Sequence, residues 1–178
     1  MKYIKLFENF EGYDPYELMI IPPGKKSEMI VKEMKSKTPN LDLIRDLITL
    51  GANLDWQDND GETVLHVCAY HNHPEIMRML IDAGADVNIQ NKWGETALHW
   101  CTSFNQSKIA RMLIDAGADV NIQNEYGNTA LHRCAFKKSS EIARMLIDAG
   151  ADKTIPNNDG KLPYELARTQ ELKKLLKP

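Results

Sequence analysis

The most regular feature of the chain is a spacing of apolar positions that is typical of an amphipathic helix. From Ile76 to Ala83, apolar residues stand at i, i+3, i+4 and i+7, which places them on one helical face. Pro74 suits a first helical position because no backbone N–H bond is lost there, and Gly84 suits a left-handed helix end. The pattern predicts a helix over 74–83 that buries one face.

This pattern recurs at a fixed period. The segment Arg-Met-Leu-Ile-Asp-Ala-Gly-Ala-Asp begins at Arg78, Arg111 and Arg144, so its consecutive copies are equally spaced. Upstream of it, the motif Thr-x-Leu-His-x-Cys begins at Thr63, Thr96 and Thr129. Two series of glycines share the same spacing: Gly61, Gly94, Gly127 and Gly160, and Gly51, Gly84, Gly117 and Gly150. An internal repeat therefore determines the architecture.

Each unit consists of a turn and two predicted helices. Asn59-Asp60-Gly61 has the residues of a tight hairpin tip, and Thr63 is suited to cap the first helix. Arg78 and Asp82 stand at i, i+4 on the polar side of the second helix and recur in the next two units, where we expect them to keep that face soluble. Such a unit cannot bury its apolar faces alone, so the units must stack and the terminal units must differ.

The chain divides into an N-terminal extension and a stacked array with two divergent ends. In the last unit Glu165 replaces the histidine, and the second helix shortens into a lysine-rich segment. At the other end, we expect the first helix over Ser27–Lys35, because Ile21–Gly24 contains two prolines and a glycine that break regular structure. The expected boundaries are 1–26 for the extension and 27–178 for the array, with an N-cap unit at 27–57, full repeats at 58–90, 91–123 and 124–156, and a C-cap unit at 157–178.

On these motifs the chain resembles an ankyrin-repeat protein, strongly over 41–168 and weakly over 27–40. Three Gly-x-Thr-x-Leu-His motifs at one constant period are highly specific. The resemblance implies an all-α repeat solenoid, an array of helix-turn-helix units with β-hairpin tips, of about five units including the divergent caps. Asn105 and Lys138 stand where the family usually has a glycine between the helices, and Val64, Ala97 and Ala130 where it usually has proline.

Composition limits the class of partner. The chain carries 22 Lys+Arg against 25 Asp+Glu, a net charge of -3, which gives no electrostatic reason to expect nucleic acid or an anionic membrane. No apolar run approaches the roughly 18 residues of a membrane span, and the first residues lack the apolar core of a secretory signal. The 3 cysteines are odd in number and widely separated, so we expect reduced thiols in a cytoplasmic protein.

The repeated histidines and cysteines are the first candidates for chemistry. His66, His99 and His132 with Cys68, Cys101 and Cys134 offer zinc-like ligands. Stacked units lie about 10 Å apart, too far for equivalent thiols to share a metal or form a disulfide. We expect each histidine to hydrogen-bond its turn, as in ankyrin repeats generally, and each cysteine to be a small buried apolar residue.

Other candidate chemistry is incomplete. His71 and His73 lie in one loop without a third ligand, so we expect a solvated loop rather than a metal site. No nucleophile has an activating base, and no phosphate-binding loop is present, so we expect no catalysis, cofactor or metal. Asn88 and Asn121 lie in a segment that resembles the target of asparaginyl hydroxylases in some animal ankyrin repeats. Two alternatives stay open for them: modification, or a purely structural role in closing the turn.

The resemblance also implies a concave groove made of the tips and the inner faces of the first helices. We expect recognition at positions that vary between otherwise near-identical units. The expected partner-binding residues are Asp60, Glu62, Tyr70, His71, Lys92, Trp93, Glu95, Phe104, Glu125, Tyr126, Asn128, Phe136, Lys137 and Asp159. Trp93 and Tyr126, on adjacent tips, are expected to contact the partner, whereas contact and packing stay open for Tyr70, Phe104 and Phe136. The acids among these residues indicate a protein partner with a basic contact surface.

The resulting hypothesis is a monomeric, non-catalytic module that holds or blocks a protein through its groove. Two other classes stay open: a viral or bacterial effector that inhibits a host enzyme or pathway, and a structural or assembly protein. Residues 1–26 either complete the N-terminal cap, with Tyr3, Ile4, Phe7 and Phe10 on one face of a short helix, or dock on a partner or fold back into the groove.

Overall fold

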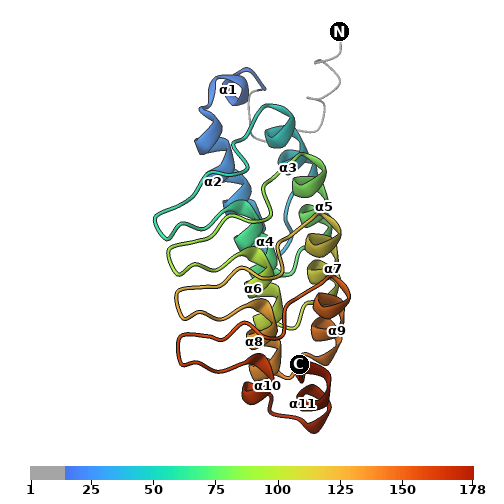
Figure 1. Ribbon diagram of the computed structural model, residues 1–178. Helices are drawn as coiled ribbons and strands as arrows, with labels where there is room; N and C mark the ends of the chain where they lie inside the picture. The colour runs from blue at the N-terminus through green and yellow to red at the C-terminus, as the bar shows by residue number, and fades with distance from the viewer. Residues whose placement is uncertain (1–14) are drawn as a thin grey trace.

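The computed structural model describes residues 15–178, which form two columns of stacked helices (Figure 1). Within this range the elements are helices and no segment forms a strand, as expected for an all-α repeat solenoid. One column, called the inner column, contains α2 (Pro23–Met34), α4 (Val64–His71), α6 (Ala97–Ser103), α8 (Ala130–Lys137) and α10 (Pro163–Leu166). The outer column contains α3 (Leu41–Thr49), α5 (Pro74–Asp82), α7 (Ser107–Asp115), α9 (Ser140–Asp148) and α11 (Gln170–Leu176), and α1 (Pro15–Ile20) precedes both.

The outer helices form for the reasons that their spacing predicts. Helix α5 begins at Pro74 and buries Ile76 and Leu80 against the core. It ends at Asp82, and Gly84 follows in a left-handed conformation with φ +88°. The same end recurs one unit later at Gly117. The predicted second helix and its glycine stop are confirmed.

The loops that project from the inner column are tight turns closed partly by a side chain (Figure 1). In the first tip, the N–H of Asp58 donates to the carbonyl of Glu62 at 3.1 Å. The N–H of Glu62 donates to the side-chain atom Oδ1 of Asp58 at 2.9 Å, and not to the backbone carbonyl of Asp58 as in a β-ladder. Because a carboxylate replaces the backbone acceptor, the tip has the shape of a hairpin without a β-ladder.

Adjacent tips are joined by their backbones. The N–H of Glu125 donates to the carbonyl of Trp93 at 3.0 Å. Gly94 lies at this contact with φ +70°, and a Cβ atom on it would lie 2.9 Å from the backbone nitrogen of Glu125. Glycine is therefore required here by its backbone conformation and by the close approach of the next tip.

The repeated histidine links each unit to the next. Nδ1 of His66 accepts the backbone N–H of Thr63 at 3.1 Å, so Nε2 carries the proton and donates to the carbonyl of Glu95 at 2.8 Å. His99 and His132 repeat both contacts. The expected hydrogen bond from the histidine to its own turn is confirmed, and a second bond fixes the neighbouring tip.

Asparagine and glutamine side chains form two further series of contacts between units. Oδ1 of Asn88 accepts the N–H of Asp119, and Oδ1 of Asn121 accepts the N–H of Asp152, both at 2.8 Å. Nε2 of Gln90 donates to carbonyls in its own tip and in the next unit. The asparagine side chains therefore hold consecutive turns together.

The first unit begins earlier than its sequence suggested. Helix α2 starts at Pro23 rather than Ser27, because proline at a first helical position fixes φ and needs no N–H partner. The buried Lys26 donates from Nζ to the carbonyl of Leu50 at 2.7 Å, at the end of α3. The expectation that residues 21–24 interrupt regular structure is wrong from Pro23 onward. The expected helix with Tyr3, Ile4, Phe7 and Phe10 lies outside the described residues.

The predicted i, i+4 charge pairs on the outer helices do not form ion pairs among residues 15–178. Arg144 instead reaches Glu171 on α11, with 2.9 Å between guanidinium and carboxylate, rather than Asp148. The equivalent Arg78 and Asp82 are both exposed. An exposed pair gains little in water, so the geometry of the neighbouring unit decides which contact is made.

Candidate functional site

Most of the predicted tip residues project into solvent. Trp93 is 42% exposed and Tyr126 is 63% exposed, on adjacent tips. Their backbones are fixed by the bonds between tips, so the rings stand on a rigid base. The charged tip residues Asp60, Lys92, Glu125 and Asp159 are exposed as well.

Behind the tips, three hollows follow one another along the inner column. The first, called the Glu62 hollow, has a volume of about 180 Å³ and is lined by Lys35, Glu62, Val67, Tyr70, His71 and Trp100. Burial raises the pKa of Glu62, and the nearby Asp58 and Asp60 raise it further, while Lys35 lowers it. The hollow therefore combines an aromatic wall with a partly desolvated acid.

Aromatic side chains from two inner helices form that wall. The ring centroid of Tyr70 on α4 lies 5.7 Å from that of Trp100 and 5.2 Å from that of Phe104, both contacts edge-to-face. Tyr70 and Phe104 are nevertheless about half exposed. Packing and exposure therefore coexist: the rings stabilise one another and still present an apolar surface.

The second hollow, called the Glu95 hollow, lies on the other side of this wall. It has a volume of about 230 Å³ and is lined by Tyr70, Glu95, Trp100, Ser103, Phe104 and Arg133. The carboxylate of Glu95 is bound by the guanidinium of Arg133, and it also accepts from Nδ2 of Asn124 at 3.2 Å. Its side chain is only 16% exposed. Glu95 was predicted as one of the free acids of the surface, but its charge is neutralised within the fold.

The third hollow, at the C-terminal end, has a volume of about 270 Å³ and is lined by Asn128, His132, Arg133, Phe136, Asn157, Asp159 and Leu166. The guanidinium carbon of Arg168 lies 3.8 Å from the ring centroid of Phe136. Oδ1 of Asn128 accepts Nδ2 of Asn157 at 3.0 Å. Phe136 and Asn128, both predicted as partner contacts, are therefore engaged in internal contacts as well, whereas Lys137 is exposed.

Several lining residues of these hollows were missed from the sequence, and two of them, Trp100 and Arg133, decide the chemistry of the first two hollows. Both occupy the variable position of Leu-His-x-Cys, which is Val67 in the first full repeat. The rule that variation between units marks recognition applied to this position too. It lies inside an otherwise constant motif, and for that reason it was overlooked.

The buried cysteines are unsuited to nucleophilic chemistry. Cys68, Cys101 and Cys134 are unpaired thiols in the core, as predicted. Burial raises the pKa of Cys134 to about 12, and it raises the pKa of Cys68 and Cys101 further. These groups stay protonated at neutral pH, so the reactive thiolate does not form. Within residues 15–178 no three His, Cys, Asp or Glu side chains gather as metal ligands.

The loop with His71 and His73 is more ordered than expected. Both imidazoles are half-buried and stack with centroids 6.0 Å apart. Nε2 of His73 donates to the carbonyl of Met34 at 2.9 Å, which ties the loop to the end of α2. The loop is thus solvated only in part: Asn72 is exposed, whereas His73 satisfies a helix C-terminus.

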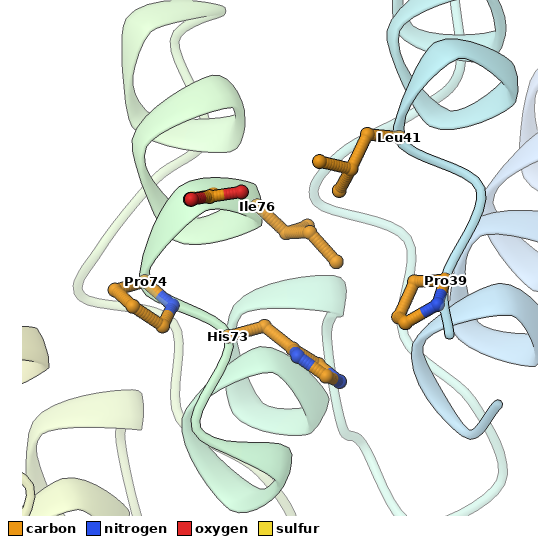
Figure 2. Close-up of a pocket in the computed structure, with 6 residues that line it drawn as sticks. Pro39, Leu41, His73, Pro74 and Ile76 are labelled. Carbon is orange, nitrogen blue, oxygen red and sulfur yellow. The ribbon is translucent and has the colours of Figure 1, made fainter. Parts of the chain in front are cut away.

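A further hollow of about 250 Å³ lies between the starts of α3 and α5, in the outer column (Figure 2). Pro39, Leu41 and Ile76 give it an apolar lining, and the His73 side chain lies at its edge (Figure 2). One nitrogen of His73 is already engaged with Met34, and Glu75 is the charged residue of the lining.

The groove residues stand on repeat units whose family is shown by comparison. No helix of residues 15–178 combines the length and the hydrophobicity that a membrane span needs. No curated protein matches the chain. A family model described as ankyrin repeats, in three copies, matches residues 34–124 and again 66–157, and ankyrin repeats are generally protein–protein interaction modules. The chain therefore belongs to the ankyrin-repeat family.

Proposed function

We propose that the chain is a non-catalytic binding module that holds an extended segment of a partner protein along the inner column. The observation that carries the proposal is the row of three hollows, separated and lined by residues that differ between units. A row of hollows suits a segment that presents successive side chains, and exposed aromatic walls supply the apolar contact area that dominates binding energy.

The charges favour a basic partner. Asp60, Glu125 and Asp159 are exposed tip acids, and Glu62 opens into the first hollow. Opposite charge on the partner would accelerate association and orient the bound segment. In this proposal the module acts as a monomer in the cytoplasm, a reducing compartment that suits three unpaired thiols.

The test is a selection of random linear peptides on the full chain and on two matched variants. The groove variant Tyr70→Ala/Phe104→Ala removes exposed aromatic surface, and the control Arg78→Ala/Arg111→Ala removes exposed side chains from the outer column. Circular dichroism checks that each variant is folded. Peptides that bind the native chain and the control but not the groove variant would support the proposal, whereas peptides that bind all three equally would contradict it.

A second variant, Trp93→Ala/Tyr126→Ala, tests the tips separately. If the selected peptides lose affinity here as well, the bound segment extends from the hollows to the tips. If affinity is unchanged, binding is confined to the inner helices and the predicted tip contacts are wrong.

A further inference from the structure

The Glu62 hollow and the Glu95 hollow are equivalent positions of the repeat with different contents. Glu62 and Glu95 occupy the same position in consecutive units, and so do Trp100 and Arg133. In the second hollow, Arg133 binds the carboxylate of Glu95. In the first, the residue equivalent to Arg133 is Trp100, which carries no positive charge. The repeat thus supplies a guanidinium to Glu95 but none to Glu62.

The carboxylate of Glu62 has no partner in the part of the chain whose side chains the structure describes. Within residues 18–178, no group donates a hydrogen bond to it, and no cation lies within ion-pair distance. Lys35 lines the same hollow, but it is exposed and forms no ion pair there. A half-buried carboxylate is stabilised most by a cation that donates charge-assisted hydrogen bonds to it and also excludes water.

The electrostatic surroundings of Glu62 favour a cation. Asp58 and Asp60 each act on it more strongly than Lys35 does, since they are the larger influences on its pKa after burial. His71, the other titratable group that lines the hollow, has a pKa lowered by burial and by the nearby His73 and Lys35, so it is neutral at pH 7. The electrostatic potential at the hollow is therefore negative, because three carboxylates outweigh the charge of Lys35.

The aromatic wall favours a planar cation. The rings of Tyr70 and Trp100 meet at 67° beside the acid. A guanidinium stacks on aromatic faces and donates two parallel bonds to a carboxylate, which an ammonium cannot do. The chain uses both contacts for its own arginines: Arg168 lies on the ring of Phe136, and Arg133 binds Glu95.

From this comparison we infer that the Glu62 hollow binds the guanidinium group of an arginine on the partner segment, against Glu62 and the Tyr70–Trp100 wall. The inference rests on the proposed function, because the arginine belongs to the bound segment. The chain's own first residues do not supply it, since residues 1–14 contain Lys2 and Lys5 but no arginine. In this proposal the occupant is a partner protein.

The probe for the test is N-acetyl-L-argininamide, titrated into the full ¹⁵N-labelled chain and followed by NMR. N-acetyl-L-citrullinamide has nearly the same shape without the charge, and N-acetyl-L-lysinamide has the charge without the planar fork. We expect the arginine probe to shift the indole signal of Trp100 and the amide signals of Glu62 and Tyr70, and the other two probes to bind roughly tenfold more weakly or worse.

Three variants locate the site. Glu62→Gln should weaken binding of the arginine probe by roughly tenfold, the effect of losing one charge-assisted contact. Glu141→Gln, which removes an exposed acid from α9 in the outer column, should leave binding unchanged. Trp100→Arg should abolish binding while the array stays folded, because it places in the first hollow the contact that Arg133 makes in the second.

Several results would overturn the inference. Equal binding of citrulline or lysine probes, or unchanged binding to Glu62→Gln or Trp100→Arg, would show that the hollow does not select a guanidinium. Groove-dependent peptides without arginine that bind Glu62→Gln normally would overturn it too and leave the proposed function intact. Conversely, arginine binding in the hollow without any groove-dependent peptide would contradict the proposed function alone.

Discussion

Replacing Gly94 by alanine tests the close contact between tips against a matched glycine elsewhere in the chain. Gly94 and Gly117 both have positive φ, at +70° and +86°. A Cβ on Gly94 would lie 2.9 Å from the backbone nitrogen of Glu125 and 3.0 Å from Cα of Asn124, whereas a Cβ on Gly117 meets no atom within 4 Å. The two substitutions therefore share the cost of backbone strain and differ in the steric clash.

The two costs can be separated in magnitude. Left-handed backbone costs an alanine about 1 kcal/mol, which is the whole expected loss for Gly117→Ala. Gly94→Ala adds the displacement of the next tip, with the bond from Glu125 to the carbonyl of Trp93 weakened or lost. Overpacking against a backbone costs about 1–3 kcal/mol, so we expect a total loss of about 3 kcal/mol.

Urea unfolding followed by far-ultraviolet circular dichroism measures both losses on the same scale. Equal losses for the two variants would refute the reasoning, because the tips would then be far enough apart to admit a methyl group. A loss of stability well above 1 kcal/mol for Gly117→Ala would also refute the reasoning, because only backbone strain of about 1 kcal/mol acts at that position.

Three further predictions concern the framework. Lys138 and Asn105 occupy equivalent positions with left-handed backbone, at φ +65° and +57°, and lysine tolerates this conformation less well than asparagine. In urea unfolding, Lys138→Gly should therefore stabilise the array by about 1 kcal/mol, and Asn105→Gly by less. Burial lowers the pKa of His66 and His99 from 6.5 to about 4, so between these pH values the unfolded chain binds more protons than the folded chain. The free energy of unfolding should therefore be at its full value above about pH 6.5 and fall by about 2 kcal/mol per histidine by about pH 5. The same denaturation series on His66→Gln should show a shallower fall, and an unchanged slope would refute the assignment. Cys101 should react with a thiol reagent only as fast as the array unfolds, because burial raises its pKa, and rapid reaction of the folded chain would contradict this.

The repeated part of the fold was predictable because each feature appears several times. Helix α5, its stop at Gly84 and the histidine contact with its turn all follow from motifs that recur at the fixed period. The start of α2 was not predictable in the same way. Its unit departs from the repeat, so Pro23 could be interpreted as a breaker or as a helix start, and only the packing of Lys26 against the end of α3 decides between them.

The candidate site was predictable only in part, because its contacts join positions that are not equivalent in the repeat. Phe104 stands one position beyond the equivalent of Tyr70 in the next unit, and the two rings touch diagonally across two inner helices. Arg133 binds Glu95 across 38 residues, from an inner helix to a tip. Comparing units at the period finds the variable positions, but it does not show which of them meet or which charges cancel.

These contacts give the groove two unlike ends. At the centre and the C-terminal end, Arg133 binds Glu95 and Arg168 lies on the ring of Phe136, so arginines of the chain contact the acid and the ring. At the N-terminal end, Glu62 and the Tyr70–Trp100 wall have the same chemistry without an internal arginine. Repeat units whose framework is nearly identical thus differ through one substitution inside Leu-His-x-Cys: Arg133 binds the acid of its hollow, whereas Trp100 supplies no cation to Glu62. If the proposal holds, a change at that position should alter what the groove selects, while the bonds between units made by the histidine beside it are kept.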